Sequence, residues 1–369
     1  MSEKNANEKN ASEKNVSEKN ASEKNTDGKK TDGKKPPVKR TPLQWAVLSL
    51  YITAVAVSLI VVVTFVALKL FAPPPKVPGQ VELPLATVDP SGQDPGAENT
   101  GDPGATDRPE TLTLNRREGV YTCLLLGVAN RGGSDTIMLG VFDTEGKTAS
   151  LVSIPRDTVV SYNGSKIKIS AAYSYGGIEA VSQCVRELLA VPIDYYVSVN
   201  TRAFREIVNE INGVWFNVPV DMDYDDDVDG LHIHIKKGYQ LLDGRQAEGV
   251  VRFRHGYASQ DIARTATQRA FLVALVKQTI TLSNVTKVTN LINILNNRVD
   301  SDMPLNDMVF FGTQAIGMDL DAALTSTVLS ANWINPYIVP GEEEVLTLVN
   351  SLGIYEEEVP AEVLRLVRP

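Results

Sequence analysis

Short apolar runs rich in aliphatic and β-branched residues recur from position 121 onward. Runs of this length and composition, bounded by turn residues, are typical of strands that are buried in a sheet. The predicted strands are YTCLLLGV at 121–128, TIMLGVFD at 136–143, SLVSIP at 150–155, DYYVSVN at 194–200, VWFNVPV at 214–220 and GVVRFR at 249–254.

Helical patterns alternate with these runs. They are GGIEAVSQCVRELLA at 176–190, TRAFREIVNEI at 201–211 and IARTATQRAFLVALVKQTI at 262–280. The tail, 283–369, is predicted to be mostly helical and to belong to the same domain. Because strands and helices interleave, we expect an α/β fold whose sheet is covered by helices on both faces.

The N-terminal part of the chain follows neither pattern. Residues 1–43 hold a polar pentad repeat, which predicts a disordered arm. Residues 44–71 contain a long apolar run, and its stretch Trp45–Leu68 would span about 36 Å as a helix, enough to cross a bilayer. The basic cluster KKPPVKR precedes this run. We therefore expect an uncleaved single-pass anchor in the cell membrane, with a cytoplasmic N-terminus and an extracellular C-terminal domain.

Residues 72–115 are rich in Pro, Gly and Asp, which predicts an extracellular linker before an outer domain at 116–369. The net charge is +4 up to position 43 and −13 beyond it, so the outer domain is not expected to bind nucleic acid. Its two cysteines, Cys123 and Cys184, either form a disulfide or stay as two buried thiols, and we favour the thiols.

Arginines gather in the segment VRFRHGYASQDIARTATQ at 251–268. If GVVRFR is a strand, Arg252 and Arg254 lie on one face of it. Arg264 and Gln268 are four residues apart in a predicted helix and also share a face. Like charges repel unless an anion lies between them, and guanidinium groups match phosphate in a bidentate manner. The pattern favours a diphosphate ligand, and a structural ion-pair network with the surplus acids is the alternative.

Loops at the ends of predicted strands carry further candidates for the same site. Arg131 and Asp135 lie between two strands, and Arg156 follows Pro155 at the end of another. Ligands of open α/β sheets gather at such strand ends. We therefore expect these three residues to lie near the arginines of 251–268.

Other motifs give little support to other chemistry. The segment DMDYDDDVDGLHIH at 221–234 resembles a calcium loop, but Asp226 and His232 occupy the positions where glycine and glutamate belong. His232 and His234 share a strand face without an evident third metal ligand. No phosphate-binding P-loop or dinucleotide-binding motif occurs, and the three histidines cluster too closely to favour a Ser-His-Asp hydrolase.

Seven motifs, in order, resemble the LytR-CpsA-Psr family of cell-wall enzymes: LLLGVANRGGSDTIMLGVF, SLVSIPRDTVV, KISAAYSYGG, DYYVSVN, INGVWFNVP, GYQLLDGRQAEGVVRFR and DIARTATQ. The resemblance implies a mixed central sheet and a hydrophobic pocket for a polyprenyl chain. It also implies transfer of a glycopolymer, such as teichoic acid or capsule, from a polyprenyl-diphosphate carrier to peptidoglycan, assisted by Mg²⁺ or Mn²⁺.

The resemblance assigns roles to individual residues. Arg156, Arg252, Arg254 and Arg264 would clamp the diphosphate as catalytic residues. Arg131, Lys168 and Gln268 would bind substrate, and Asp135 would hold the metal ion.

The sequence departs from the family pattern at four positions. Ala129 replaces an aspartate that is a metal ligand, Gly133 and Thr267 replace arginines, and Ser170 replaces an asparagine. Two functions therefore follow: an active glycopolymer–peptidoglycan phosphotransferase, or a catalytically weakened member that binds the lipid-linked polymer or scaffolds cell-wall assembly.

Overall fold

A computed structural model of the protein describes residues 73–85, 111–128, 133–227, 230–254, 260–279, 288–315 and 318–368. The predicted arm and the run Trp45–Leu68 lie outside these ranges. Within them, no helix is long and apolar enough to cross a bilayer. The membrane anchor and its topology stay predictions.

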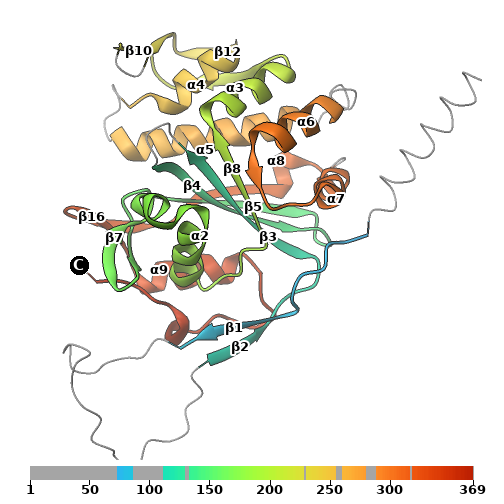
Figure 1. Ribbon diagram of the computed structural model, residues 1–369, viewed down its shortest axis with the longest axis vertical. Helices are drawn as coiled ribbons and strands as arrows, with labels where there is room; N and C mark the ends of the chain where they lie inside the picture. Colours follow the sequence, from blue (N-terminus) through green and yellow to red (C-terminus); the bar gives the residue numbers. More distant parts are fainter. Residues whose placement is uncertain are drawn as a thin grey trace, which may run out of the picture. The chain divides into compact units, whose positions relative to one another are not determined.

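The described strands and helices alternate along the chain (Figure 1). The strands are β1 Gln80–Pro84, β2 Thr111–Asn115, β3 Val120–Val128, β4 Ser134–Asp143, β5 Thr148–Ile154, β6 Val159–Tyr162, β7 Ser165–Lys168, β8 Tyr195–Asn200, β9 Val214–Val218, β10 Met222–Asp226, β11 Leu231–Ile235, β12 Gly238–Leu242, β13 Asp300–Ser301, β14 Leu324–Val328, β15 Ala331–Ile334 and β16 Tyr337–Pro340. The helices are α2 Ile169–Leu189, α3 Thr201–Glu210, α4 Gly244–Arg252, α5 Gln260–Thr279, α6 Val288–Arg298, α7 Leu305–Ala315, α8 Leu320–Ala323, α9 Glu342–Ser351 and the 3-10 turn η2 Ala361–Val363.

The central sheet has the strand order β13-β8-β3-β4-β5-β14. It is mixed, because β3 pairs with β8 and β5 pairs with β14 in parallel, whereas β4 is antiparallel to both of its neighbours. The predicted strands 121–128, 136–143, 150–155 and 194–200 correspond to β3, β4, β5 and β8. Their order and alternation confirm the mixed α/β sheet.

Helices cover both faces of this sheet (Figure 1). Alternate residues of a strand point to opposite faces, so Leu124 and Leu126 of β3 pack against α2 and α9. Tyr121 points the other way and packs edge-on against Phe310 and Phe311 of α7. The helix α5 also contacts the sheet, at β5.

A second layer is built on α5. The strand pairs β9–β12 and β10–β11 pack with α3, α4 and α5 around a separate buried cluster. Phe271 of α5 is 1% exposed and lies between Phe204 of α3 and Phe216 of β9, with ring centroids 5.7 and 5.2 Å away. The helix α5 therefore lies between this layer and the central sheet (Figure 1).

The run GVVRFR is not a strand, and this prediction was wrong. Asp243 and Gln246 form a capping box that starts α4, and the helix continues to Arg252. The chain becomes extended only at Phe253, which is 2% exposed. A short apolar run does not distinguish a strand from one helical turn that is buried on one side, and here the cap decides.

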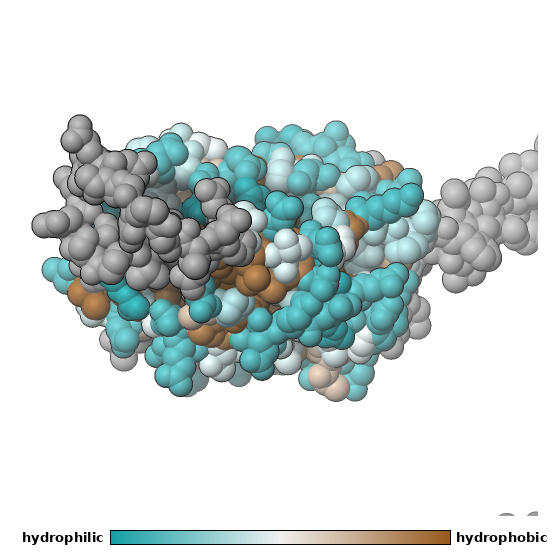
Figure 2. Space-filling model, turned by 90° about the horizontal axis from the view of Figure 1, so that it is seen from below, coloured by the Kyte–Doolittle hydropathy of each residue, from teal (hydrophilic) through white to brown (hydrophobic). Residues whose placement is uncertain are grey.

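Two further expectations change. The predicted linker 72–115 contains ordered structure at both ends, because β1 pairs with β2 and buries Leu83 and Leu114 in the core. The tail contributes strands as well as helices, including β14 at the edge of the central sheet. Figure 2 shows the face seen from the side of β1 and β2, where apolar residues gather among polar ones.

The two cysteines are free thiols, as we favoured. Cys184 is buried and Cys123 is half-buried. Burial disfavours the thiolate and raises the pKa of Cys123 to about 12 and that of Cys184 to about 11.

Candidate functional site

Asp135 lies at the start of β4, beside an irregularity in the sheet. The register between β3 and β4 shifts between Gly127 and Val128, so that Val128 lies opposite Ser134. Ser134 is fully buried and its hydroxyl donates to the carbonyl oxygen of Thr136 at 3.1 Å. The bulge and this hydrogen bond fix the strand end and leave the Asp135 side chain 36% exposed.

Two predicted arginines converge on Asp135 from distant parts of the chain. Nη1 of Arg156 donates to Oδ1 at 2.9 Å, and Nη2 of Arg254 donates to Oδ2 at 3.3 Å. The guanidinium side chains are 28% and 44% exposed, so solvent and solutes reach both. A carboxylate of the protein therefore lies between Arg156 and Arg254, whereas we predicted an anion between Arg252 and Arg254.

Lys168 extends the network on the side of Arg156. Its Nζ lies 2.9 Å from Oδ1 of Asp157, and Nε of Arg156 lies 3.8 Å from the other oxygen of that carboxylate. The backbone N–H of Ser170, in the first turn of α2, donates to the carbonyl of Arg156 at 3.1 Å. The first turn of α2 holds no acidic residue. The positive end of the helix dipole adds to the cations here.

Arg252 belongs to a different network. Its Nη1 donates to Oε1 of Glu248 at 3.0 Å, and Nη1 of Arg205 in α3 lies 3.1 Å from Oε2. The side chain of Glu248 is only 10% exposed. Gly244 permits this contact between α3 and α4, because a Cβ there would lie 2.4 Å from the carbonyl oxygen of Arg205.

Arg264 and Gln268 share one face of α5, as their spacing predicted, and this face is buried. Arg264 is 1% exposed and Gln268 is 9% exposed. Nε2 of Gln268 donates to the carbonyl oxygen of Val251 at 2.9 Å, which ties α5 to the last turn of α4. Gln268 thus supports the segment that presents Arg252 and Arg254.

The structure brings Asp135, Arg156, Lys168 and Arg254 into one network. Arg131 and the substituted position Ala129 lie outside the described residues. The sequence motifs did not indicate the counter-ions Asp157 and Glu248, nor Arg205, the second partner of Glu248. A helical interpretation of α4 would have found Glu248, because it precedes Arg252 by four residues.

The described residues do not by themselves form a metal centre, since no three His, Cys, Asp or Glu side chains among them converge suitably for an ion. Asp135 is the one predicted ligand. Mg²⁺ is commonly held by one or two carboxylates together with phosphate oxygens and water. Asp135 therefore fits such an ion only in company with a phosphate ligand.

The acidic ribbon β10–β11 carries cross-strand ion pairs. Nδ1 of His232 lies 2.7 Å from Asp225, and Nδ1 of His234 lies 2.6 Å from Asp223. All four side chains are exposed. The segment is thus a solvated acidic ribbon whose carboxylates Asp223 and Asp225 pair with histidines.

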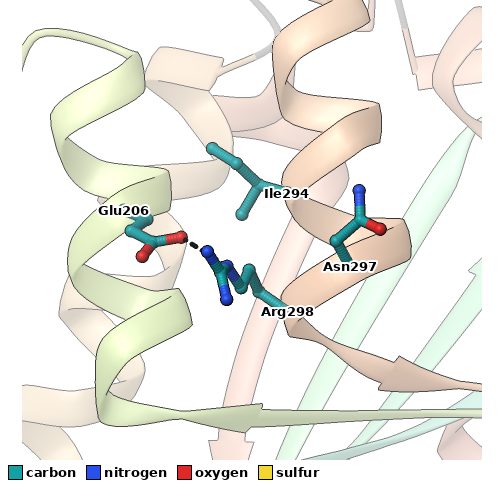
Figure 3. A pocket seen from close by; sticks show the side chains of 4 residues that line it. All are labelled: Glu206, Ile294, Asn297 and Arg298. Carbon is teal, nitrogen blue, oxygen red and sulfur yellow. Dashed lines mark ion pairs between the residues drawn. The ribbon is translucent and has the colours of Figure 1, made fainter.

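One described pocket, of about 530 Å³, shares no lining residue with these networks (Figure 3). It opens between α3 and α6 and is lined by Glu206, Ile294, Asn297 and Arg298. Nε of Arg298 lies 3.3 Å from Glu206, and Figure 3 shows the two side chains facing each other. Since its lining is mostly polar, this pocket is not the apolar one that the resemblance implies.

The chain belongs to the LytR_cpsA_psr family, whose model matches residues 90–347. Among curated relatives, the polyisoprenyl-teichoic acid–peptidoglycan teichoic acid transferase TagV of Bacillus subtilis (strain 168) is 31% identical over 211 residues, which is 54% of each chain. TagT of the same organism is 31% identical over 202 residues, 51% of this chain and 62% of TagT. The chain thus spans between half and two thirds of the length of these relatives.

Solved structures agree with the fold. The crystal structure of Bacillus subtilis TagV matches with a TM-score of 0.57 and 27% identity, over 64% of this chain and 96% of that one. A structure of TagT bound to LIIa-WTA matches with a TM-score of 0.53 and 26% identity, over 64% and 90%.

Proposed function

We propose that the protein is a membrane-anchored phosphotransferase. It would attach an anionic glycopolymer, of the teichoic acid or capsule type, from a polyprenyl-diphosphate carrier to extracellular peptidoglycan. The observation that carries this proposal is the pair of solvent-accessible arginine side chains, Arg156 and Arg254, that share one carboxylate. The names of the relatives, which are teichoic acid transferases, support the substrate class.

The diphosphate would take over the guanidinium groups from Asp135. Arg forks bind phosphate oxygens in the same bidentate geometry as a carboxylate, and a diphosphate carries more negative charge. Lys168 and the N-terminus of α2 lie on the same side and favour the same charge. Arg252 and Arg264 stay candidates for this clamp, but Arg252 is the weaker one, because its carboxylate partner Glu248 is nearly buried and would be costly to displace.

The transfer would proceed by substitution at phosphorus. The oxygen of a peptidoglycan sugar hydroxyl forms a bond to the phosphorus that carries the glycan, and the bond from that phosphorus to the bridging oxygen breaks. Polyprenyl phosphate leaves with the electron pair, and the hydroxyl proton is released. Guanidinium groups fixed around the leaving phosphate stabilise the charge that develops on it. Asp135, freed from its arginines, would help to hold Mg²⁺ or Mn²⁺, which neutralises phosphate charge.

A catalytically weakened protein that binds the lipid-linked polymer or scaffolds wall assembly is the second candidate. The observation that favours it is that Asp135 is the one predicted metal ligand in the described network, while Ala129 lacks a carboxylate. In an active enzyme, Ala129→Asp should lower the Mg²⁺ concentration at which transfer saturates, because a second carboxylate strengthens binding of a hard cation.

The test is to incubate the full chain in detergent with polyprenyl-diphosphate-linked glycan, Mg²⁺ and peptidoglycan. The transferase predicts glycan covalently attached to peptidoglycan and release of polyprenyl phosphate. Binding of the lipid-linked glycan without transfer, in the wild type and in Ala129→Asp, would establish the second candidate instead.

A further inference from the structure

Arg269 differs from the arginines of the networks described above. Its side chain is partly buried, and its Nη1 is buried without a hydrogen-bond partner among the described residues. Arg156, Arg252 and Arg254 each have a carboxylate within 3.3 Å. Burial lowers the pKa of Arg269. A partly desolvated cation of this kind costs stability unless an anion neutralises it.

Helix geometry places Arg269 on the side of α5 that is turned away from the second layer. Phe271 points to α3 and β9, and Arg269 precedes it by two residues, a rotation of about 200°. Arg269 therefore lies on the side where α5 contacts β5 of the central sheet. Figure 1 shows α5 running between the two layers.

The same side of α5 is apolar beyond Arg269. Val273 and Val276 follow it by four and seven residues, which places them on its face of the helix. Both are half-buried, and neither belongs to the buried clusters. A ligand that satisfied Arg269 and this face together would need an anionic group joined to an apolar chain.

Arg269 lies two residues after Thr267, one of the positions at which the sequence departs from the family pattern. The family usually has an arginine there, and in this chain Thr267 is 6% exposed on the buried side of α5. The guanidinium appears two residues later, on the opposite side of the helix. The arginine that Thr267 replaces is therefore missing from the buried side of α5, and Arg269 places a guanidinium on the side that faces the sheet.

We propose that Arg269 binds a phosphate of the lipid carrier, with the first part of the polyprenyl chain lying along Val273 and Val276. This assignment rests on the proposed function, because it takes the diphosphate lipid as the ligand. Arg269 is not among the arginines to which the family resemblance assigns a role. The assignment also predicts that the lipid chain runs along α5.

The test compares Arg269→Met and Arg269→Lys with the wild-type full chain in detergent. Arg245→Met is the matched control, because Arg245 is exposed on α4 and loses the same charge. Affinities are measured for farnesyl diphosphate, farnesol and inorganic pyrophosphate, together with the melting temperature of the ligand-free protein.

We expect Arg269→Met to melt at a higher temperature than the wild type, because an uncompensated buried cation is removed. It should bind farnesyl diphosphate about tenfold or more weakly, the usual effect of losing a charge-assisted contact, and farnesol equally well. Arg269→Lys should recover part of the affinity, and Arg245→Met should change neither quantity. A Val273→Asn variant should weaken binding of farnesyl diphosphate and leave pyrophosphate unaffected.

A lower melting temperature of Arg269→Met with farnesyl diphosphate affinity within twofold of wild type would overturn the assignment. Equal losses for pyrophosphate and farnesyl diphosphate, with no effect of Val273→Asn, would overturn the lipid direction. Glycan transfer by Arg269→Met at the wild-type rate and affinity would refute Arg269 and leave the transferase intact. Binding through Arg269 without any transfer would refute the transferase and leave this site intact.

Discussion

Two arginine networks lie on either side of Phe253, and they differ in how deeply their carboxylate is buried. Glu248, 10% exposed, holds Arg252 and Arg205 between two helices. Asp135, 36% exposed, holds Arg156 and Arg254 at the end of a strand. A buried carboxylate cannot leave its arginines without a large desolvation cost, whereas an exposed one exchanges readily with a solute anion. The same residue types therefore stabilise the fold in one network, and in the other they are available for the ligand of the proposed function.

The largest effect should follow from Asp135→Asn. We expect transfer to fall about a hundredfold, because the variant removes the predicted metal ligand, while the melting temperature changes little since the pair is exposed. Transfer rates and thermal unfolding of the full chain measure both. Asp221→Asn, an exposed acid paired with Lys236, is the control and should transfer like the wild type.

Glu248→Gln should have the opposite profile. Removing this charge leaves two partly buried guanidinium groups without a carboxylate, and we expect a loss of about 2 kcal/mol in the free energy of unfolding. Chemical denaturation measures it. If Glu248→Gln were as stable as the wild type and lost transfer instead, the distinction between the two networks would fail.

Substitutions of Arg254 and Arg252 should differ in the same way as those of Asp135 and Glu248, with smaller effects on affinity and stability. Arg254→Lys keeps the charge and loses the fork, so affinity for a polyprenyl diphosphate should fall about tenfold at unchanged stability. Arg252→Lys should lower stability by about 1 kcal/mol and affinity by less than twofold. Equal affinity losses in both variants would show that Arg252 also contacts the ligand.

The ion pairs between histidines and aspartates in β10–β11 are more exposed than either arginine network. Substitutions there should have the smallest effect on stability. The hydrogen bond to Asp223, and then the charge of Asp225, raise the pKa of His234 above its ordinary value of 6.5. The stabilisation is therefore complete below pH 6.5 and is lost as the pH rises through the raised value. Melting curves of wild type and His234→Gln should differ slightly at pH 6 and coincide at pH 9.

Sequence patterns predicted the parts of the fold that repeat a local rule. The runs at 121–128 and 136–143 became neighbouring strands because alternate side chains pack on the two covered faces. The run GVVRFR failed because its length fits either element, and the decisive capping box lay upstream at Asp243. The edge strand β14, with the sequence LTSTV, has too few apolar residues to give a pattern.

The site was predictable as a set of residues but not as a set of pairs. The motifs indicated Asp135, Arg156 and Arg254, yet the contact between Asp135 and Arg254 joins positions 119 residues apart. The structure also separated Arg252 from Arg254, which a strand would have kept on one face. Local periodicity contains no information on which carboxylate each arginine meets, because that depends on how α4 packs against α3 and α5.

The pairing of β1 with β2 limits how far the domain could move from a membrane. A flexible linker over 72–115 would reach about 150 Å when fully extended. However, β1 is bound to the core. Residues 75–79 also contact the domain, because the Tyr121 hydroxyl donates to the carbonyl oxygen of Pro75 and Val77 packs against the cluster around Tyr121. Only residues 72–74 remain as a leash, with a reach of about 10 Å. If Trp45–Leu68 is the anchor, this short leash would keep the domain at the bilayer surface, where the polyprenyl carrier of the proposed function would be confined by its own tail.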